Sequence, residues 1–489
     1  MHWLQTHWIV LSILGIYSLL LVRHALAGNR QTKGLSDYYV GGRSMGGIAL
    51  GISFFATYAS TNSFVGFAGQ SFSYGIGWLL IGPLLVAFCF IGWKWIAPRL
   101  YGFTVALDSI TIPDFIGFRF ASRPARVLSA LVVLFASFLY MTAVFKGIGN
   151  LLETFLQIPY KAAIIIVFFI VMIYTAVGGF ISVVKTDVVQ GIIMMFAALM
   201  LFVGTVNAAG GLATFNTVRD IPEASHLFSW DAAMPFTVLL GILIASTMKL
   251  IVEPRQLSRF YALKSEKETK KGIWVSTLAF LGAFACLIPI GIYARHLVPA
   301  TIEDTDLIVP TLVAQGDIFH PFIGAFLVVA MIAAAMSSLD SVLLVMATTF
   351  HRDVASVVRP VSSDQAGINS TRIYVGLFAL ITALIALNPP GGIVMLTSFS
   401  GSLYAVCFLA PLVLGLFWSK GEGTTAFASI LVGIITLLVW RLLPLDVAIH
   451  PVFPALLAST LVYVLMAVNR PANPDPRIKA LFEESKVVA

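Results

Sequence analysis

The chain has 489 residues, of which 59% are hydrophobic and only 11% are charged. Soluble domains carry about 25% charged residues, so a soluble fold of this size could not cover so much apolar surface. The formal charge of +7 does not indicate nucleic-acid binding, because the basic residues lie in short loops between apolar runs, where they orient a membrane protein.

Thirteen apolar segments, each long enough to cross ~30 Å of hydrocarbon, follow one another with no sizeable soluble domain between them. They lie at 8–27, 47–71, 75–97, 126–156, 161–178, 186–209, 233–255, 273–296, 318–350, 370–388, 393–418, 424–443 and 450–468. The sequence therefore predicts an all-α polytopic membrane protein. Cys89, Cys286 and Cys407 all fall within these segments, which indicates packing rather than a disulfide framework or a metal pair.

The first segment ends at Ala25-Leu26-Ala27, which resembles a signal-peptidase site. No Lys or Arg precedes the segment, however, and the positive charges follow it, so a retained helix is favoured over a cleaved signal. With the N-terminus outside, 24 of the 30 Lys and Arg residues fall on the cytoplasmic side. This distribution predicts a plasma-membrane protein with its N-terminus outside and its C-terminus in the cytoplasm.

The second segment is rich in small and polar residues, GGIALGISFFATYASTNSFVGFAG at 46–69. Its middle carries Ser60, Thr61, Asn62 and Ser63. Such residues either allow close helix packing or accompany a broken helix whose freed carbonyls bind an ion. The seventh segment, five segments further along the chain, contains Lys249, Glu253 and Pro254. Interruptions in matching segments of two halves are typical of the binding site of a secondary transporter.

Two basic residues, Lys146 and Lys249, lie inside predicted spans, and Asp187 begins another. A buried lysine needs a partner, which is either a substrate carboxylate or an acid on a neighbouring helix. Asp187 is either a favourable helix N-terminal acid or an ion ligand. Sequence spacing leaves these alternatives open.

The ninth segment contains AAAMSSLDSVLL at 333–344. Ala334, Ser337, Ser338 and Ser341 share one helix face, and Asp340 lies beside them. Hard cations prefer oxygen ligands, and hydroxyls with few formal charges suit Na⁺ better than Ca²⁺. The alternative is that these serines hold helices together or bond back to their own helix.

Together these residues resemble the sodium:solute symporter family, from DYYVGGRS (37–44) to GLFW (415–418). The other matching motifs are TIPDFIGFRF, KTDVVQG, PRQLSRFYALKS and AAAMSSLDSVLL. The resemblance implies the inverted-repeat fold of the bacterial leucine transporter, with five plus five core helices. The expected units are an extra N-terminal helix in 1–30, the repeats 46–209 and 233–418, and two helices with a cytoplasmic tail in 424–489.

The resemblance also implies two cation positions. The main Na⁺ site would use the carbonyls of Ala56, Ala59 and Ala334 and the hydroxyls of Ser337 and Ser338. A second Na⁺ would be held by Asp187, Ser337, Asp340 and Ser341. Asp340 stands where other members have a hydroxyl, so this second position is open to Na⁺, to a proton, or to neither.

For the solute, the resemblance implies a site between the second and seventh segments. The candidates are Ser60, Thr61, Asn62, Ser63, Lys249 and Lys146. Sugar carriers have a carboxamide and an acid at the positions of Ser63 and Asn62, and their absence counts against a sugar. A carboxylate-bearing solute, either a monocarboxylate or an amino acid, is favoured as a partner for a buried lysine. A symporter for a sugar or another neutral solute, a proton-coupled carrier and a sensor-like member are the alternatives.

No metal-binding His pair, nucleophile motif or cofactor loop occurs in the sequence, so we expect no enzyme. The expected partners are the solute, Na⁺ and the lipid bilayer, without nucleic acid or an obligate protein partner.

Overall fold

The computed structural model describes residues 2–231, 234–299, 302–358, 362–443, 447–468, 470, 473 and 475–487. These residues are almost entirely helical, and within them the only β-type pairing is an isolated bridge between Met45 and Leu263. The predicted all-α class is confirmed. Residue 233, where the second repeat is predicted to begin, and the last two residues of the predicted C-terminal unit lie outside the described residues.

The first half of the chain forms α1 (His2–Gln31), α2 (Leu35–Val40), α3 (Gly47–Tyr58), the π-helical turn η2 (Asn62–Gly66), α4 (Phe67–Tyr74), α5 (Ile81–Ile91), α6 (Ala97–Leu107), α7 (Ile112–Arg119), α8 (Arg123–Leu156), α9 (Tyr160–Ala208) and α10 (Thr214–Thr217). The second half forms α11 (Phe236–Thr247), α12 (Lys249–Val252), α13 (Pro254–Tyr261), α14 (Glu268–Leu287), α15 (Ile290–Ala294), α16 (Ile308–Ala314), α17 (Pro321–Thr349), α18 (Ser356–Val358), α19 (Asp364–Ala386), α20 (Ile393–Phe408), α21 (Gly415–Phe417), α22 (Gly423–Leu442), α23 (Val452–Val468) and α24 (Pro476–Val487).

Ten helical stretches of the described chain are long and apolar enough to cross a membrane. Two shorter apolar helices, α3 and α23, account for two more of the predicted segments. The remaining one comes from α9, which covers two predicted segments by itself. Each of the thirteen predicted segments is therefore helical in the structure.

The long helix α9 folds as two crossings because of one glycine. A straight helix of its 49 residues would extend ~74 Å, more than twice the ~30 Å of the hydrocarbon layer. Gly179 interrupts it with φ 61° and ψ −169°, a conformation open essentially to glycine alone. A Cβ atom there would lie 2.7 Å from Cδ2 of Tyr38. The break lies where the sequence predicts the loop between the fifth and sixth spans.

Two further breaks interrupt helices at the centre of the bundle. α3 ends at Tyr58, and Ala59 leaves the helical conformation with φ −67° and ψ 109° before the chain resumes in η2. α12 ends at Val252, and Glu253 is extended, with φ −78° and ψ 124°. Glu253 precedes Pro254, and a proline disfavours the α conformation in the residue before it. Helix ends leave backbone groups without intrahelical partners, so both breaks offer polar groups inside an apolar bundle.

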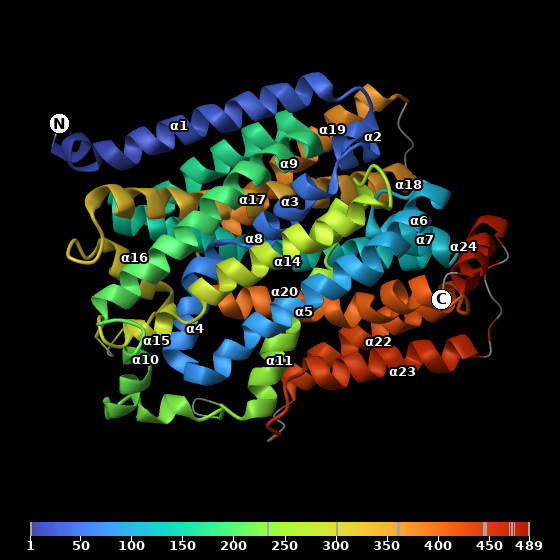
Figure 1. The fold of residues 1–489 in the computed structure, drawn as a ribbon. Coiled ribbons are helices and arrows are strands. Elements are labelled where there is room, and N and C mark those ends of the chain that lie inside the picture. The colour runs from blue at the N-terminus through green and yellow to red at the C-terminus, as the bar shows by residue number, and fades with distance from the viewer. Residues whose placement is uncertain are drawn as a thin grey trace.

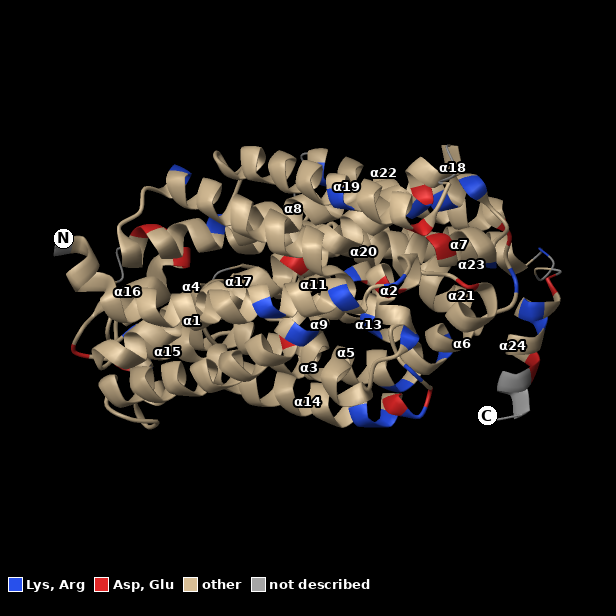
Figure 2. Ribbon diagram, turned by 90° about the horizontal axis from the view of Figure 1, so that it is seen from above, with Lys and Arg blue, Asp and Glu red and all other residues tan. Residues whose placement is uncertain are grey.

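The arrangement of the bundle agrees with an odd number of crossings (Figure 1). α1 lies along one side, α22 and α23 lie on the opposite side, and the two termini are at opposite ends. Figure 2 shows most Lys and Arg residues towards the end that carries α6, α7, α18 and α24, and few at the end of α15 and α16. The predicted charge asymmetry between the two faces is thus present in the fold.

Candidate ion and solute site

The break after α3 lies against the serine stripe of α17. The Ser337 hydroxyl donates to the carbonyls of Ala56 and Ala334, at 3.0 Å in each case. The neighbouring Ser338 hydroxyl donates to the Thr57 carbonyl at 3.2 Å. All of these residues are buried. The hydroxyls of Ser337 and Ser338 and the carbonyls of Ala56 and Ala334 therefore lie in one contact between α3 and α17.

Two residues at this point were not predicted. Thr57 supplies a carbonyl next to that of Ala56, and Tyr140 of α8 donates from its hydroxyl to Ser338 Oγ at 3.3 Å. Ala59, the remaining predicted ligand, is buried at the break itself. The polar character of α3 indicated a break, but spacing within one helix could not show which carbonyl would face α17.

A buried ionic cluster lies beside the serine stripe, and Asp187 and Arg259 are its centre. Arg259 Nη2 lies 2.7 Å from Asp187 Oδ2. The Ser53 hydroxyl donates to the same carboxylate oxygen at 2.6 Å. Both charged side chains are at most 1% exposed. Arg259 was not among the predicted site residues, although the motif PRQLSRFYALKS that carries it is polar and follows the break at Pro254.

Asp340 lies next to this cluster and, among the described residues, forms no ion pair within 4.0 Å. Its Oδ1 accepts from the Ser341 hydroxyl at 3.3 Å, and its Oδ2 is buried without a hydrogen-bond partner among the described residues. Asp187 Oδ1 is likewise buried without a hydrogen-bond partner among the described residues. The structure thus brings three of the four predicted second-site residues, Asp187, Asp340 and Ser341, into one buried cluster, while the hydroxyl of Ser337 is directed at the main-site carbonyls.

The four polar residues predicted to line the solute site are all buried at the restart of the broken helix. The backbone amide of Ser60 donates to Ser63 Oγ at 3.4 Å, and that of Asn62 donates to Ser60 Oγ at 3.2 Å. Thr61 Oγ1 and Asn62 Oδ1 have no hydrogen-bond partner within the described part of the chain. Two buried polar atoms at the break therefore lack a hydrogen-bond partner among the described residues.

Lys249 is a buried cation without a carboxylate. Its side chain is 3% exposed, and Nζ donates to the carbonyl of Thr397 on α20 at 3.2 Å. Nζ also lies 5.2 Å from the centre of the Tyr140 ring. The nearby Glu253 is paired with Arg255 at 3.1 Å, and no described Asp or Glu lies within ion-pair distance of Lys249. The sequence left two possible partners for this lysine, a substrate carboxylate or an acid on a neighbouring helix. The described residues provide no such acid at ion-pair distance.

Lys146, in contrast to Lys249, lies beside carboxylates of the protein. Its Nζ lies 3.1 Å from Asp306 Oδ2 and 3.8 Å from Asp304 Oδ2, in the loop before α16. The backbone amide of Ile393 also donates to Asp306, at 3.3 Å. Burial raises the pKa of Asp306, whereas Lys146 opposes that shift. Lys146 therefore has an internal partner, which ties α8 to this loop.

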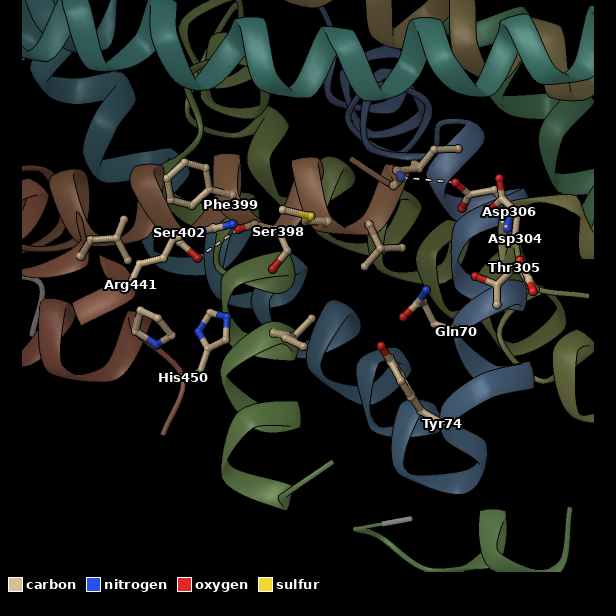
Figure 3. Close-up of a pocket in the computed structure, with 18 residues that line it drawn as sticks. Gln70, Tyr74, Asp304, Thr305, Asp306, Ser398, Phe399, Ser402, Arg441 and His450 are labelled. Carbon is tan, nitrogen blue, oxygen red and sulfur yellow. Dashed lines mark hydrogen bonds between the residues drawn. The ribbon is translucent and has the colours of Figure 1, made fainter. Parts of the chain in front are cut away.

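A cavity of about 340 Å³ opens between α4, α20, α22 and the loop before α16 that carries Asp304 and Asp306. In Figure 3, Arg441 and His450 lie towards one end of it and Asp304 and Asp306 towards the other.

The α20 wall of this cavity includes Ser398 and Ser402. Ser398 directly follows Thr397, the acceptor of Lys249. The cavity and the buried lysine therefore contact the same stretch of α20. This volume lies in the range of small-molecule sites.

Solved structures establish the class of this fold. A Na⁺-coupled sialic acid symporter in a substrate-bound outward-open state matches with a TM-score of 0.81 at 20% identity, over 95% of this chain and 99% of that one. Mhp1, a nucleobase-cation-symport-1 family transporter, matches with a TM-score of 0.54 at 14% identity, over 92% and 99% of the two chains. The fold is thus the polytopic leucine-transporter-type fold with its inverted-repeat core.

Sequence relatives define the family. The model of the sodium:solute symporter family matches residues 38–433. A sodium/pantothenate symporter of Haemophilus influenzae is 30% identical over 83% of this chain and 84% of its own length. The high-affinity proline transporter PutP of Bacillus subtilis is 31% identical over 88% and 92%. The chain belongs to the sodium:solute symporter family, and Na⁺ is its coupling ion.

Proposed function

We propose that this symporter imports a small carboxylate-bearing solute, either a monocarboxylate or an amino acid, together with Na⁺. The observation that carries the proposal is Lys249, a buried cation whose direct contacts among the described residues are a carbonyl and an aromatic ring, with no carboxylate at ion-pair distance. Burying an unpaired charge costs several kcal/mol, and a solute carboxylate would remove that cost. The similar proteins named for pantothenate, proline and sialic acid support this class of solute, because all three compounds carry a carboxylate.

The proposed solute site lies between the two broken helices. Lys249 would bind the carboxylate, and Ser60, Thr61, Asn62 and Ser63 would contact the rest of the solute. The buried Thr61 Oγ1 and Asn62 Oδ1 support this role, because each lacks a hydrogen-bond partner in the described chain. Lys146 stays a prediction, and its contact with Asp306 favours the internal alternative.

The proposed main Na⁺ site consists of Ala56, Ala59 and Ala334 through their carbonyls and Ser337 and Ser338 through their hydroxyls. The contacts of Ser337 with two of those carbonyls support it. Oxygen atoms without formal charge suit a monovalent cation. In this proposal Na⁺ would bridge α3 and α17, so that its arrival and departure would favour different positions of the two helices.

We further propose plasma-membrane insertion with the N-terminus outside, from the positive-inside rule and the charge distribution in Figure 2. The cavity of Figure 3 would then open to the outside, because it lies next to the loop before α16, which the same topology places externally. We propose that the chain transports without catalysis and without an obligate protein partner, since ion and solute binding account for the buried polar groups described above.

The test compares Lys249→Met with Lys249→Arg in proteoliposomes under an imposed Na⁺ gradient. Uptake of labelled L-proline, pantothenate and a neutral sugar is measured. A hydrogen bond to a charged group contributes about 1.5–3 kcal/mol, so K249M should lower the affinity for the transported carboxylate roughly ten- to a hundredfold. K249R, which keeps the charge, should lose less. Na⁺-driven uptake of the sugar alone, unaffected by K249M, would contradict the proposed solute class.

A further inference from the structure

An apolar groove runs along the outer surface of the bundle between α5 and α14. Its volume is about 660 Å³, and none of the described residues that line it is charged. The two helices lie side by side in Figure 1 and in Figure 2, and Leu281 of the lining is 52% exposed. Both helices belong to stretches long and apolar enough to cross a membrane, so the groove faces the acyl chains of the bilayer.

The α14 wall of the groove continues into a tryptophan and a lysine. Its lining residues recur at spacings of four and three, which keep them on one helix face: Thr277, Leu281, Phe284 and Ile288. The same spacing towards the start of α14 leads to Trp274, which is 67% exposed, and then to the exposed Lys270. Tryptophan is typical of the boundary between lipid and water, so this face passes from hydrocarbon to headgroups near Trp274.

The α5 wall ends in the same way. Phe90 lines the groove, and its ring centre lies 6.2 Å from that of Trp95, which is 51% exposed. Lys94 follows Phe90 by four residues, in the π-helical turn η4 (Gly92–Ile96), and is exposed as well. Each wall of the groove thus ends in an exposed tryptophan and an exposed lysine.

The two lysine-bearing ends are packed against each other. Gly272 of α14 lies against the ring of Trp93 in η4, so closely that a Cβ atom at Gly272 would be 2.0 Å from Cζ3 of the ring. Lys94 is the residue after Trp93, and Lys270 lies two residues before Gly272. Both lysines are therefore at the same end of the groove.

Positive charge is in excess at this end. Glu268 pairs with Lys264 at 3.5 Å and with Lys271 at 3.2 Å, whereas no described Asp or Glu lies within ion-pair distance of Lys94 or Lys270. Figure 2 shows basic residues gathered at one end of α14, at the edge of the bundle. The proposed topology places this end in the cytoplasm, and clusters of basic residues beside a membrane-spanning helix on that side attract anionic lipids.

We propose that the groove binds one anionic phospholipid of the cytoplasmic leaflet, with an acyl chain between α5 and α14 and the phosphate at Lys94 and Lys270. Two lysines without an acidic partner at one end of an uncharged groove match a phosphate that is followed by an acyl chain. This complementarity of charge favours a lipid over a second copy of the chain as the occupant. The inference uses the proposed topology, but neither the proposed solute nor the proposed Na⁺ site.

The bound lipid would also pack close to the broken helix α3. Phe280 and Phe284 line the groove, and their ring centres lie 5.4 and 5.9 Å from that of Tyr58. Tyr58 is the last residue of α3 before the break. The acyl chain would therefore contact the rings that support the end of this helix.

Native mass spectrometry of the purified full-length protein in detergent measures the binding directly. Phosphatidylglycerol and phosphatidylcholine with identical acyl chains are titrated separately, and the affinity for the first bound lipid is determined. We expect phosphatidylglycerol to bind more tightly. A basic residue close to anionic lipid contributes roughly fivefold in affinity, so Lys94→Gln combined with Lys270→Gln should weaken phosphatidylglycerol binding about thirtyfold and leave phosphatidylcholine unchanged. Equal affinities of the wild-type protein for the two lipids would overturn the inference.

Two further variants separate the headgroup from the acyl chain. Lys33→Gln combined with Lys479→Gln is the matched control, because both lysines are exposed, on the link between α1 and α2 and on α24. Ala285 is an exposed residue of the lining, so Ala285→Trp should fill the groove and weaken the binding of both lipids.

Three results with these variants would contradict the lipid site. They are an unchanged phosphatidylglycerol affinity in the K94Q/K270Q protein, an equal loss in the K33Q/K479Q control, and a dimer that A285W disrupts while lipid affinity stays the same. The last result would assign the groove to a second copy of the chain. Because the measurement contains neither Na⁺ nor a solute, each of these results leaves the proposed function standing.

Discussion

Ser337 and Ser338 are neighbours on α17, yet their hydroxyls donate to the carbonyls of different residues of α3. Ser337 contacts Ala56 and its own helix at Ala334, whereas Ser338 contacts Thr57 and accepts from Tyr140. Because Ser337 also bonds within α17, only Ser338 depends entirely on groups from other helices. Ser338 is therefore the residue at which the role in Na⁺ binding is best separated from a role in helix structure.

We expect Ser338→Ala to weaken Na⁺ activation of uptake while the protein stays folded. One lost oxygen ligand corresponds to roughly 1 kcal/mol, so the Na⁺ concentration for half-maximal activation should rise about fivefold to tenfold. Ser129→Ala is the control, because Ser129 is equally buried and donates only to Ala125 of its own helix at 2.7 Å. An unchanged Na⁺ activation curve for S338A would remove Ser338 from the site.

The serine stripe could be predicted because residues three and four apart share a face on any helix. Arg259 could not be predicted in the same way. Its guanidinium group crosses from α13 to oxygens on α3, α9 and α17, and no spacing within one helix indicates such a contact. For both Lys249 and Lys146 the sequence left a substrate carboxylate and an internal acid as alternatives, and only the packing of the loop before α16 shows that Lys146 has a partner in Asp306.

At the scale of the element, apolar length predicted each crossing because the bilayer requires about 20 apolar residues per helix. The sequence also indicated where helices break, through Pro254 and the polar residues after Ala59. It did not indicate that the connection between the fifth and sixth crossings is so short, with Gly179 as the residue that leaves the helical conformation between them.

We expect Gly179→Ala to destabilise the protein by about 1–3 kcal/mol, the cost of placing a side chain in a glycine-only backbone conformation. The new Cβ would also lie 2.7 Å from Cδ2 of Tyr38. Gly282→Ala in α14 is the control, since a Cβ there meets nothing within 4 Å and alanine favours a helix by about 0.5–1 kcal/mol. The midpoint of thermal unfolding in detergent should fall for G179A and hold or rise for G282A. Equal midpoints would show that Gly179 is not strained.

At the scale of the whole molecule, most buried charges balance one another. Asp187 pairs with Arg259, Glu253 with Arg255, and Asp306 with Lys146. Among the described residues, the buried Asp340 and Lys249 form no ion pair, and neither does Arg119, which donates to the backbone carbonyls of Gly415 and Trp418. The charges of Asp340 and Lys249 match the two cargoes of the proposed cycle, a cation and a carboxylate, so the net charge of the transport core does not need to change when both bind.

This charge balance limits how far the symporter can concentrate its solute. With one Na⁺ per solute and the membrane potential clamped at zero, a tenfold Na⁺ gradient supplies ~1.4 kcal/mol and supports an accumulation of about tenfold. Two Na⁺ would support about a hundredfold. A potential of 100 mV supplies ~2.3 kcal/mol per charge moved, which adds nothing for a monoanionic solute because its charge cancels that of Na⁺, and roughly fortyfold for a zwitterion. Proteoliposomes with a potassium–valinomycin clamp give the limiting ratio for each solute. At zero potential we expect the limiting solute ratio to equal the Na⁺ ratio raised to the number of coupled ions. A limit equal to the Na⁺ ratio therefore indicates one Na⁺, its square indicates two, and no accumulation would contradict coupling to Na⁺.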